Sequence, residues 1–252
     1  MPTIQRVDIQ DRIALFGYAH VPHLIQRQKR IDASNLPSQH ARFAMAELGH
    51  AMLTHAGYRA IGFDRVFVAT NDCTDGTDTM LDLLQRKGLV QHRENPFRSM
   101  NLKPQHAALQ AAEAEPIMQN CGWGICMDVD EFINIKIGDG TLRALYEAMG
   151  DANMISLTWR LIGNSDVAPY EDRFLLEQFT DCAPEVIRKP HQAWGFKTLF
   201  RRIDIFRKFG VHRPKGLQPE HWEKIHWVNG SGKPMPKSTL RNGWRSTTET
   251  YG

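Results

Sequence analysis

The organisation of this chain follows from Cys126-Met127-Asp128-Val129-Asp130-Glu131-Phe132, which places three acidic residues within four positions at the end of an apolar run. Side chains at i and i+2 of an extended strand share one face, so the spacing predicts that Asp128 and Asp130 face one ligand together. Carboxylates are oxygen ligands of Mg²⁺ and Mn²⁺, which often bind substrate phosphates at the same time. The stretch therefore predicts a metal site for a nucleotide diphosphate. The alternative is an acidic strand end that leads into a solvated turn.

Upstream of this stretch the sequence predicts a strand, a loop and a helix in succession. Residues 65–70 are β-branched and aromatic, which favours a buried strand, and residues 71–77 carry the Asn, Asp and Gly residues of a turn. Apolar residues at helical spacing follow in residues 78–87, and Gly88 is a natural stop. A polar loop is therefore expected at the end of a buried strand.

The order V-F-V-A-T-N-D-C-T-D-G-T, then a helix, then D-V-D-E-F resembles the nucleotide-sugar half of a family 2-like glycosyltransferase with the GT-A fold. The resemblance continues through residues 155–160, 197–201 and 210–214 and covers about residues 59–252. It implies an α/β fold of GT-A-like (Rossmann-like) type, with a mixed, mostly parallel sheet flanked by helices. It also implies transfer of a sugar from a nucleotide-diphosphate donor to a glycan or another hydroxyl acceptor, with Mn²⁺ or Mg²⁺ as cofactor.

The resemblance assigns roles to the acidic residues. Asp130 is implied as the direct metal ligand, and Asp128 is implied on the metal or on the donor ribose. Asp72 matches the position that contacts the nucleobase or ribose, and Asp75 is a further donor-binding candidate. For Asp72 and Asp75 the alternative is loop capping through hydrogen bonds from side chain to backbone.

Basic and imidazole side chains complete the predicted donor site. His212, in Gly-Val-His-Arg-Pro, could be a third metal ligand or meet a phosphate, since neutral imidazole suits a borderline cation such as Mn²⁺. The alternative is a structural histidine. Lys197 and Arg213 are predicted phosphate partners, Arg213 by its bidentate fork.

The acceptor side is less specified. Trp159 could stack on a sugar ring beside Arg160, although a tryptophan at a strand end also makes good core. An inverting transfer needs a carboxylate near the acceptor hydroxyl as general base. We take Glu131 and Asp172 as the catalytic candidates, with Asp166 and Glu171 also available.

The first sixty residues have a different character. They predict a strand over residues 12–18, a basic connection over 24–35, a helix over 39–55 that Gly57 closes, and a second strand that begins at residues 60–64. The phrases F-G-Y-A-H-V-P, Q-K-R-I-D and A-G-Y-R-A-I-G-F-D resemble an internal segment of oxygen-independent coproporphyrinogen III oxidase.

The two resemblances meet at residues 58–64, which predicts a chimera. The alternative is that both resemblances reflect sequence features that are common to βαβ units in general. Residues 1–64 contain no cysteine, so the iron-sulfur chemistry of the oxidase cannot have come across. The chain is therefore divided into an oxidase-like segment at 1–64, a GT-A-like nucleotide-sugar domain at 65–214 and a loop-rich tail at 215–252. In this division residues 12–18 should lie parallel to residues 65–70 in the central sheet.

The remaining segments are simpler. Thr141 should cap a helix over residues 142–149, and strands are predicted at 154–159 and 196–201. A short helix is predicted over residues 203–209. The tail is rich in Gly, Pro, Ser, Thr and Lys, and we expect it to be irregular and truncated.

Composition bounds the class of protein. The chain has 252 residues, 42% of them hydrophobic and 23% charged, which is ordinary for one globular α/β domain. It contains no apolar run near the roughly 20 residues of a membrane span and no signal peptide, so we expect a cytoplasmic protein. The net charge of +3 says little about partners, and we expect no nucleic-acid partner. Basic residues in the last third could meet phosphate or an acidic membrane surface in a peripheral contact, or form a solvated face.

Overall fold

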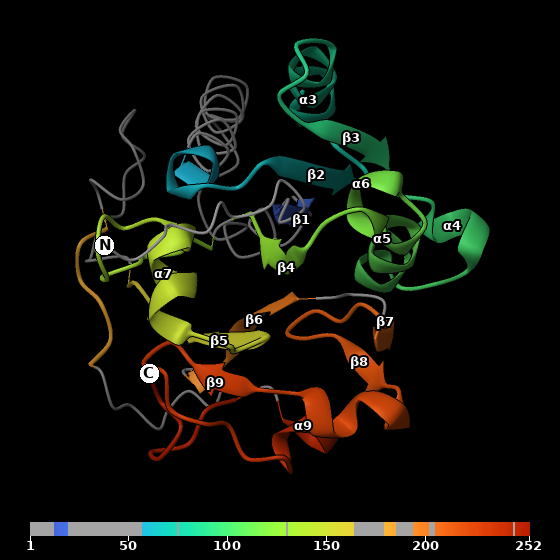
Figure 1. Cartoon of the computed structure of the whole chain (residues 1–252). Coiled ribbons are helices and arrows are strands. Elements are labelled where there is room, and N and C mark those ends of the chain that lie inside the picture. The colour runs from blue at the N-terminus through green and yellow to red at the C-terminus, as the bar shows by residue number, and fades with distance from the viewer. Residues whose placement is uncertain are drawn as a thin grey trace, which may run out of the picture.

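A seven-stranded sheet runs through the described part of the molecule in the order β3-β2-β1-β4-β6-β5-β9 (Figure 1). The structure is a computed structural model, and it describes residues 13–19, 57–74, 76–129, 131–163, 179–184, 194–201, 205–243 and 245–252. The strands of this sheet are β1 (Ile13–Ala19), β2 (Arg65–Thr70), β3 (Gln91–Glu94), β4 (Trp123–Asp128), β5 (Met154–Thr158), β6 (Phe196–Arg201) and β9 (Trp227–Asn229).

The sheet is mixed and mostly parallel, as predicted. Strands β3, β2, β1 and β4 are parallel neighbours, and β9 is parallel to β5. Strand β6 runs antiparallel to both β4 and β5. Because β2 lies on one side of β1 and β4 on the other, the strand order reverses at β1. In open α/β sheets such a switch point opens a crevice at the carboxyl ends of the strands, where ligands bind.

The predicted position of β1 is confirmed. Leu15 pairs with Val66 of β2 on one side and with Ile125 of β4 on the other. The helix predicted over residues 39–55 lies outside the described residues. The N-terminal strand is therefore a central strand of the sheet.

Helices cover both faces of the sheet. Their bounds are α3 (Thr77–Arg86), α4 (Phe97–Met100), α5 (Pro104–Glu113), α6 (Pro116–Gln119), α7 (Leu142–Met149), α9 (Thr239–Asn242) and the 3-10 helix η4 (Pro219–Lys224). The helices predicted over 78–87 and 142–149 are confirmed, and the Thr141 hydroxyl accepts a hydrogen bond from Ala144 N at 3.2 Å. Among the described residues, none of the helices has the length and apolar character that crossing a bilayer requires.

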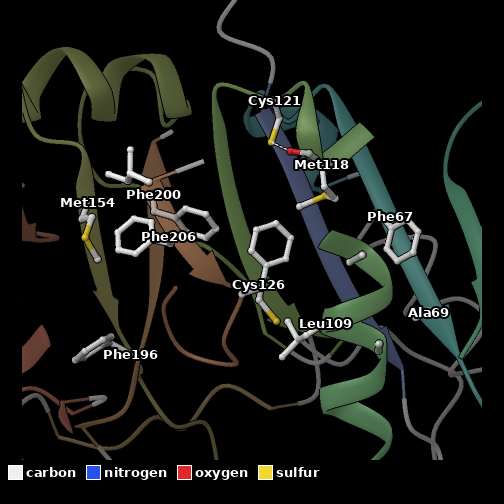
Figure 2. Packing of buried hydrophobic residues seen from close by; sticks show 14 of the residues in the cluster. Phe67, Ala69, Leu109, Met118, Cys121, Cys126, Met154, Phe196, Phe200 and Phe206 are labelled. Carbon is white, nitrogen blue, oxygen red and sulfur yellow. Dashed lines mark hydrogen bonds between the residues drawn. The ribbon is translucent and has the colours of Figure 1, made fainter. Parts of the chain in front are cut away.

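The two faces hold two hydrophobic clusters because side chains alternate along each strand. Trp123, Ile125 and Met127 of β4 pack in one cluster with residues of α3 and α7. Cys126 of the same strand packs in the other, with Leu109 of α5. Figure 2 shows this second cluster, in which α5 lies over the strands and the Phe200 and Phe206 rings pack together.

The prediction that residues 60–64 begin a strand is wrong. Residues 57–61 are helical, and the helix ends at Gly62, which adopts φ 110°. Gly62 N donates to Arg59 O at 3.2 Å and Phe63 N donates to Tyr58 O at 3.0 Å, which is the Schellman pattern of a helix C-terminus. The Tyr58 and Phe63 rings meet edge to face at 5.5 Å and supply the accompanying apolar contact.

The predicted helix over residues 203–209 is also wrong. Phe206–Lys208 forms strand β7, which pairs antiparallel with β8 (Lys215–Leu217) in a separate two-stranded sheet. Phe206 and Phe209 both pack on Phe200 of β6. The packing of these rings, and not the intrinsic helix propensity of the segment, determines that Phe206–Lys208 forms a strand.

The tail predicted to be irregular contributes to the main sheet. Within residues 215–252, β9 pairs with β5, and Trp227 packs edge to face on Phe196 at 6.1 Å. The rest of the described tail consists of β8, short helices and turns. Burial of Trp227 and Met235, with the pairing of β9, thus anchors a segment whose composition favours loops.

The Gly62 helix end gives a test of the fold. Replacing Gly62 with Ala should destabilise the protein by about 1–2 kcal/mol, because a Cβ is strained at this positive φ. The measurement is the free energy of unfolding in urea. Gly57→Ala in the same helix is the control: its Cβ would have no neighbour within 4 Å, so we expect no loss and a gain of up to about 1 kcal/mol. Equal effects at both positions would contradict the Schellman assignment.

Candidate active site at the carboxyl end of β4

The acidic stretch forms a turn where β4 ends. The strand ends at Asp128, and Glu131 N donates to Asp128 O at 3.1 Å, so the backbone reverses within four residues. The prediction that extended backbone continues past Asp128 is therefore wrong at Val129, which lies in a turn. Asp130 itself lies outside the described residues, and its role as a metal ligand stays a prediction.

Lys197 lies at the centre of the site. Strand β6 runs antiparallel to β4, which brings Lys197, near the start of β6, beside the end of β4. Its ammonium nitrogen is 3.0 Å from Asp128 Oδ2 and 3.2 Å from Glu131 Oε2. Lys197 is 1% exposed, and a buried ammonium is tolerated only where such partners compensate for its lost hydration.

Burial and charge act against each other in this ion cluster. Burial by itself lowers the pKa of Lys197, but Cys126, Glu131 and Asp128 outweigh it and leave the pKa raised. Burial raises the pKa of Glu131 to about 7, and the Lys197 ammonium opposes that rise. Lys197 therefore carries its charge at neutral pH.

His212 adds a neutral imidazole to the cluster. Its Nδ1 lies 3.1 Å from the Phe196 carbonyl oxygen, which can only accept, so Nδ1 carries the proton and Nε2 carries the lone pair. Burial and the Lys197 charge lower the pKa of His212 to about 4. A neutral histidine held by a carbonyl at one nitrogen is the usual form of a metal ligand.

Trp159 borders the same cluster. Its ring centroid is 5.3 Å from that of His212 and 6.0 Å from the Lys197 ammonium. Trp159 N donates to Gly195 O at 2.7 Å, and a Cβ at Gly195 would lie 2.3 Å from the Trp159 ring. Glycine at position 195 is thus required for Trp159 to lie here. Arg160, the other acceptor candidate, is exposed, and its neighbours Cys182 and Tyr251 raise its pKa.

Asp72 lies in the loop after β2, at the same edge of the sheet as Asp128. It adopts φ 55°, which is uncommon for a residue with a side chain and is often found at functional sites. Its carboxylate pairs with Arg98 at 2.6 Å. Asn71 beside it accepts a hydrogen bond from Asn95 Nδ2 at 3.3 Å.

Sequence reasoning missed Arg98, Asn95 and Gln105. Gln105, in the first turn of α5, has its Nε2 3.4 Å from Asp128 Oδ1 and so links this helix to the site. An Asn-Pro dipeptide directly after the strand Gln91–Glu94 is the signal that could have indicated Asn95. Nothing in the local sequence distinguishes Arg98 or Gln105.

Arg213 is engaged elsewhere. Its guanidinium donates to the carbonyl oxygens of Gly243, Leu240 and Pro214 at 2.8, 2.8 and 3.1 Å. These contacts hold the end of α9, and we therefore do not include Arg213 in the donor site. Asp75 and Asp172, together with Asp166 and Glu171, lie outside the described residues. In the part of the chain that is described, no three His, Cys, Asp or Glu side chains group to hold a metal ion.

Fold and site together define a class: an α/β protein with a cluster of charged side chains at the switch point of its sheet. Residues 52–231 match the family described as glycosyltransferase family 92, and this range includes the whole cluster. The chain therefore belongs to glycosyltransferase family 92. The predicted glycosyltransferase class is confirmed by this family match.

A short N-terminal part of the chain is similar to oxygen-independent coproporphyrinogen III oxidases. It is 48% identical over 54 residues to an oxygen-independent coproporphyrinogen III oxidase of Cereibacter sphaeroides and 43% identical over 54 residues to that of Paracoccus denitrificans. Each match covers 21% of this chain and 12% of the oxidase. The Escherichia coli oxidase is 34% identical over 83 residues, which is 33% of this chain and 16% of that protein.

The chain is weakly similar to a solved structure from S. aureus. The crystal structure of residues 1–349 of TarS from S. aureus aligns with a TM-score of 0.35 and 11% sequence identity. The alignment covers 75% of this chain and 47% of that one.

The lowered pKa of His212 predicts acid sensitivity. The folded-state pKa of about 4 lies below the ordinary value of 6.5, so the unfolded chain binds more protons between these pH values. His212 then contributes stability above pH 6.5 that is lost as the pH falls through 4, on the order of 1–2 kcal/mol after allowance for partial exposure. His212→Asn keeps a donor for the Phe196 carbonyl. In urea unfolding it should lose less stability than the wild type over this range, and equal losses would contradict a buried neutral imidazole.

Proposed function

We propose that this protein is a metal-dependent glycosyltransferase of GT-A architecture that takes its sugar from a nucleotide-diphosphate donor. Family membership supports the reaction class. The observation that carries the donor class is the convergence of Asp128, Lys197 and His212 at the carboxyl end of β4, next to the switch point of the sheet. Anionic ligands that carry a metal are bound by such a combination of carboxylate, imidazole and cation.

The side chains present fit Mn²⁺ or Mg²⁺. The Asp128 side chain is 35% exposed, and the Lys197 contact is made by its Oδ2. His212 is neutral with its lone pair on Nε2, which suits Mn²⁺ in particular. In this proposal Asp128, Asp130 and His212 hold the cation, which stabilises negative charge on the leaving nucleoside diphosphate when it is bound.

Lys197 would act on the phosphates through its charge, because an ammonium that is 1% exposed offers a ligand no surface for direct contact. Its positive charge lies 3.0 Å from Asp128 Oδ2, so it would act at short range on a diphosphate that meets Asp128 through a cation. Because the ammonium is already buried, little of its hydration has to be removed on binding. Lys197 and the cation together would offset the charge of the diphosphate.

The side chains at the edges of the cluster indicate where the nucleoside of the donor and the acceptor sugar would bind. Asp72 and Arg98, beside the carboxyl end of β2, would contact the nucleoside, and Trp159, beside Lys197 and His212, would contact the acceptor sugar. Aromatic faces suit the apolar faces of sugar rings. The cytoplasm remains the proposed compartment, with an acidic membrane surface as a proposed peripheral contact of the basic residues.

A second candidate is a protein that keeps the fold but binds no donor. It is favoured by one observation: β1, in the part of the chain that is similar to the oxidases, occupies the switch-point strand of the sheet. We propose that the chain is a chimera joined near residues 58–64. In that case the loop after β1 carries residues selected for another substrate, and donor affinity would be weakened.

The melting temperature in the presence of a nucleoside diphosphate, which is what remains of the donor after transfer, distinguishes the two candidate functions. Mn²⁺ or Mg²⁺ together with UDP or GDP should raise the melting temperature, because binding to the native state alone stabilises by about 2.7 kcal/mol at a hundredfold excess over Kd. Asp130→Ala should abolish the metal-dependent part of the shift. Glu147→Ala, an exposed carboxylate on α7, should leave it unchanged. No shift in the wild type with either nucleotide would favour the second candidate, and an intact shift in Asp130→Ala would remove Asp130 from the metal site.

A further inference from the structure

We infer that Glu131 is a positioning residue, which fixes Asp128 and Lys197 in the geometry that receives the diphosphate, and is not the general base. This inference rests on the proposed function and assigns Glu131 a different role within the same site. From the sequence, Glu131 is a catalytic candidate because an inverting transfer needs a carboxylate as general base.

The first argument is the set of hydrogen bonds that close the turn. Glu131 Oε2 accepts from Asp128 N at 2.8 Å, and Glu131 N donates to Asp128 O at 3.1 Å. Both polar groups of the Asp128 backbone are thus bound by one residue, three positions along the chain. The start of the Asp128 side chain is fixed by these contacts, since its Cα lies between the two bound backbone groups.

The second argument concerns Lys197. The same Oε2 atom of Glu131 that accepts from Asp128 N also lies 3.2 Å from the Lys197 ammonium. A lysine side chain has four rotatable bonds, so two carboxylate partners fix its nitrogen where one would leave it freedom to move. Without Glu131, the buried ammonium would have Asp128 as its remaining carboxylate partner in the described cluster. It would then move further onto Asp128 and compete there with a metal ion.

The third argument is that Glu131 is poorly placed to act on an acceptor hydroxyl. Its side chain is 15% exposed, and one of its oxygens already interacts with two donors inside the protein. A general base must reach the proton that it removes, directly or through one water. Glu131 therefore acts through Asp128 and Lys197.

Tyr58 holds the other side of the turn. Its hydroxyl donates to the Glu131 carbonyl oxygen, 73 positions away in sequence. Tyr58 lies in the helical segment 57–61, whose end is fixed by Gly62 and by the ring contact with Phe63. The acidic turn is therefore anchored to the chain that precedes β2.

The test is calorimetric titration of the full chain with UDP and with GDP in the presence of Mn²⁺. Glu131→Ala should weaken nucleotide binding about tenfold or more, because both Asp128 N and Lys197 lose a partner. Glu131→Gln should weaken it less, because its amide oxygen still accepts from Asp128 N. Tyr58→Phe should fall between the wild type and Glu131→Ala, and Glu147→Ala should match the wild type. Circular dichroism checks that each variant is folded.

The outcomes separate this inference from the proposed function. If the wild type binds a nucleotide and both Glu131 variants bind it equally well, the positioning role is wrong and the general base role regains support. If Glu131→Gln binds as poorly as Glu131→Ala, the hydrogen bond to Asp128 is not what Glu131 contributes. If the wild type binds neither nucleotide, the proposed function fails. In that case, electron paramagnetic resonance measures the binding of Mn²⁺ without nucleotide. Weaker Mn²⁺ binding by Glu131→Ala than by the wild type supports the positioning role. Equal binding by the two proteins, or no binding by either, overturns it.

Discussion

A single buried ammonium joins the two halves of the sheet at the site. Strand β6 pairs with β4 through Trp123 with Arg201 and Gly124 with Phe200, both at the start of β4. Among the described residues the ladder between these strands stops there, and Lys197 bonds to Asp128 and Glu131 at the other end. Breaking a buried ion pair by removing one partner costs about 3–5 kcal/mol, because a charge is left uncompensated. The position of β6, His212 and Trp159 relative to the acidic turn therefore depends on this contact.

Much of the fold follows from local sequence. Strands β2 and β6 have the predicted bounds, α7 begins at the predicted Thr141 cap, and β1 lies parallel to β2, as the crossover rule predicts. Hydrophobic periodicity, helix capping and the handedness of crossovers determine these elements, and all three can be judged directly from a sequence. The Gly62 helix end and β7 were predicted wrongly, because they depend on the Tyr58–Phe63 contact and on the rings around Phe200, which join residues through the tertiary structure.

The site was predictable in its residue types and less so in its contacts. Asp128, Lys197, His212 and Trp159 were each identified from the sequence, and the structure brings them together. The pairing of Lys197 with both carboxylates was not predicted, because it depends on the register of two strands about seventy positions apart. The turn after Asp128 was missed because the strand period was continued past the end of the strand.

The N-terminal segment shows how fold and site can be separated. Strand β1 hydrogen bonds through its backbone to β2 and β4, and backbone pairing accepts many sequences. A ligand site at the same strand depends on side chains instead. Strand β1 can therefore complete the sheet whether or not the loop after it suits a nucleotide, while Lys197 and the acidic turn lie within residues 52–231, which match family 92.

The central claim is that the buried Lys197 charge binds the diphosphate of the donor. The most direct measurement is the Kd of UDP with Mn²⁺ for the wild type, for Lys197→Met and for Lys87→Met, which removes an exposed lysine at the end of α3. The account predicts that Lys197→Met, folded by circular dichroism, loses about tenfold or more in affinity, as expected for loss of a buried positive charge beside the phosphates, while Lys87→Met does not. Equal affinity in all three proteins would contradict it.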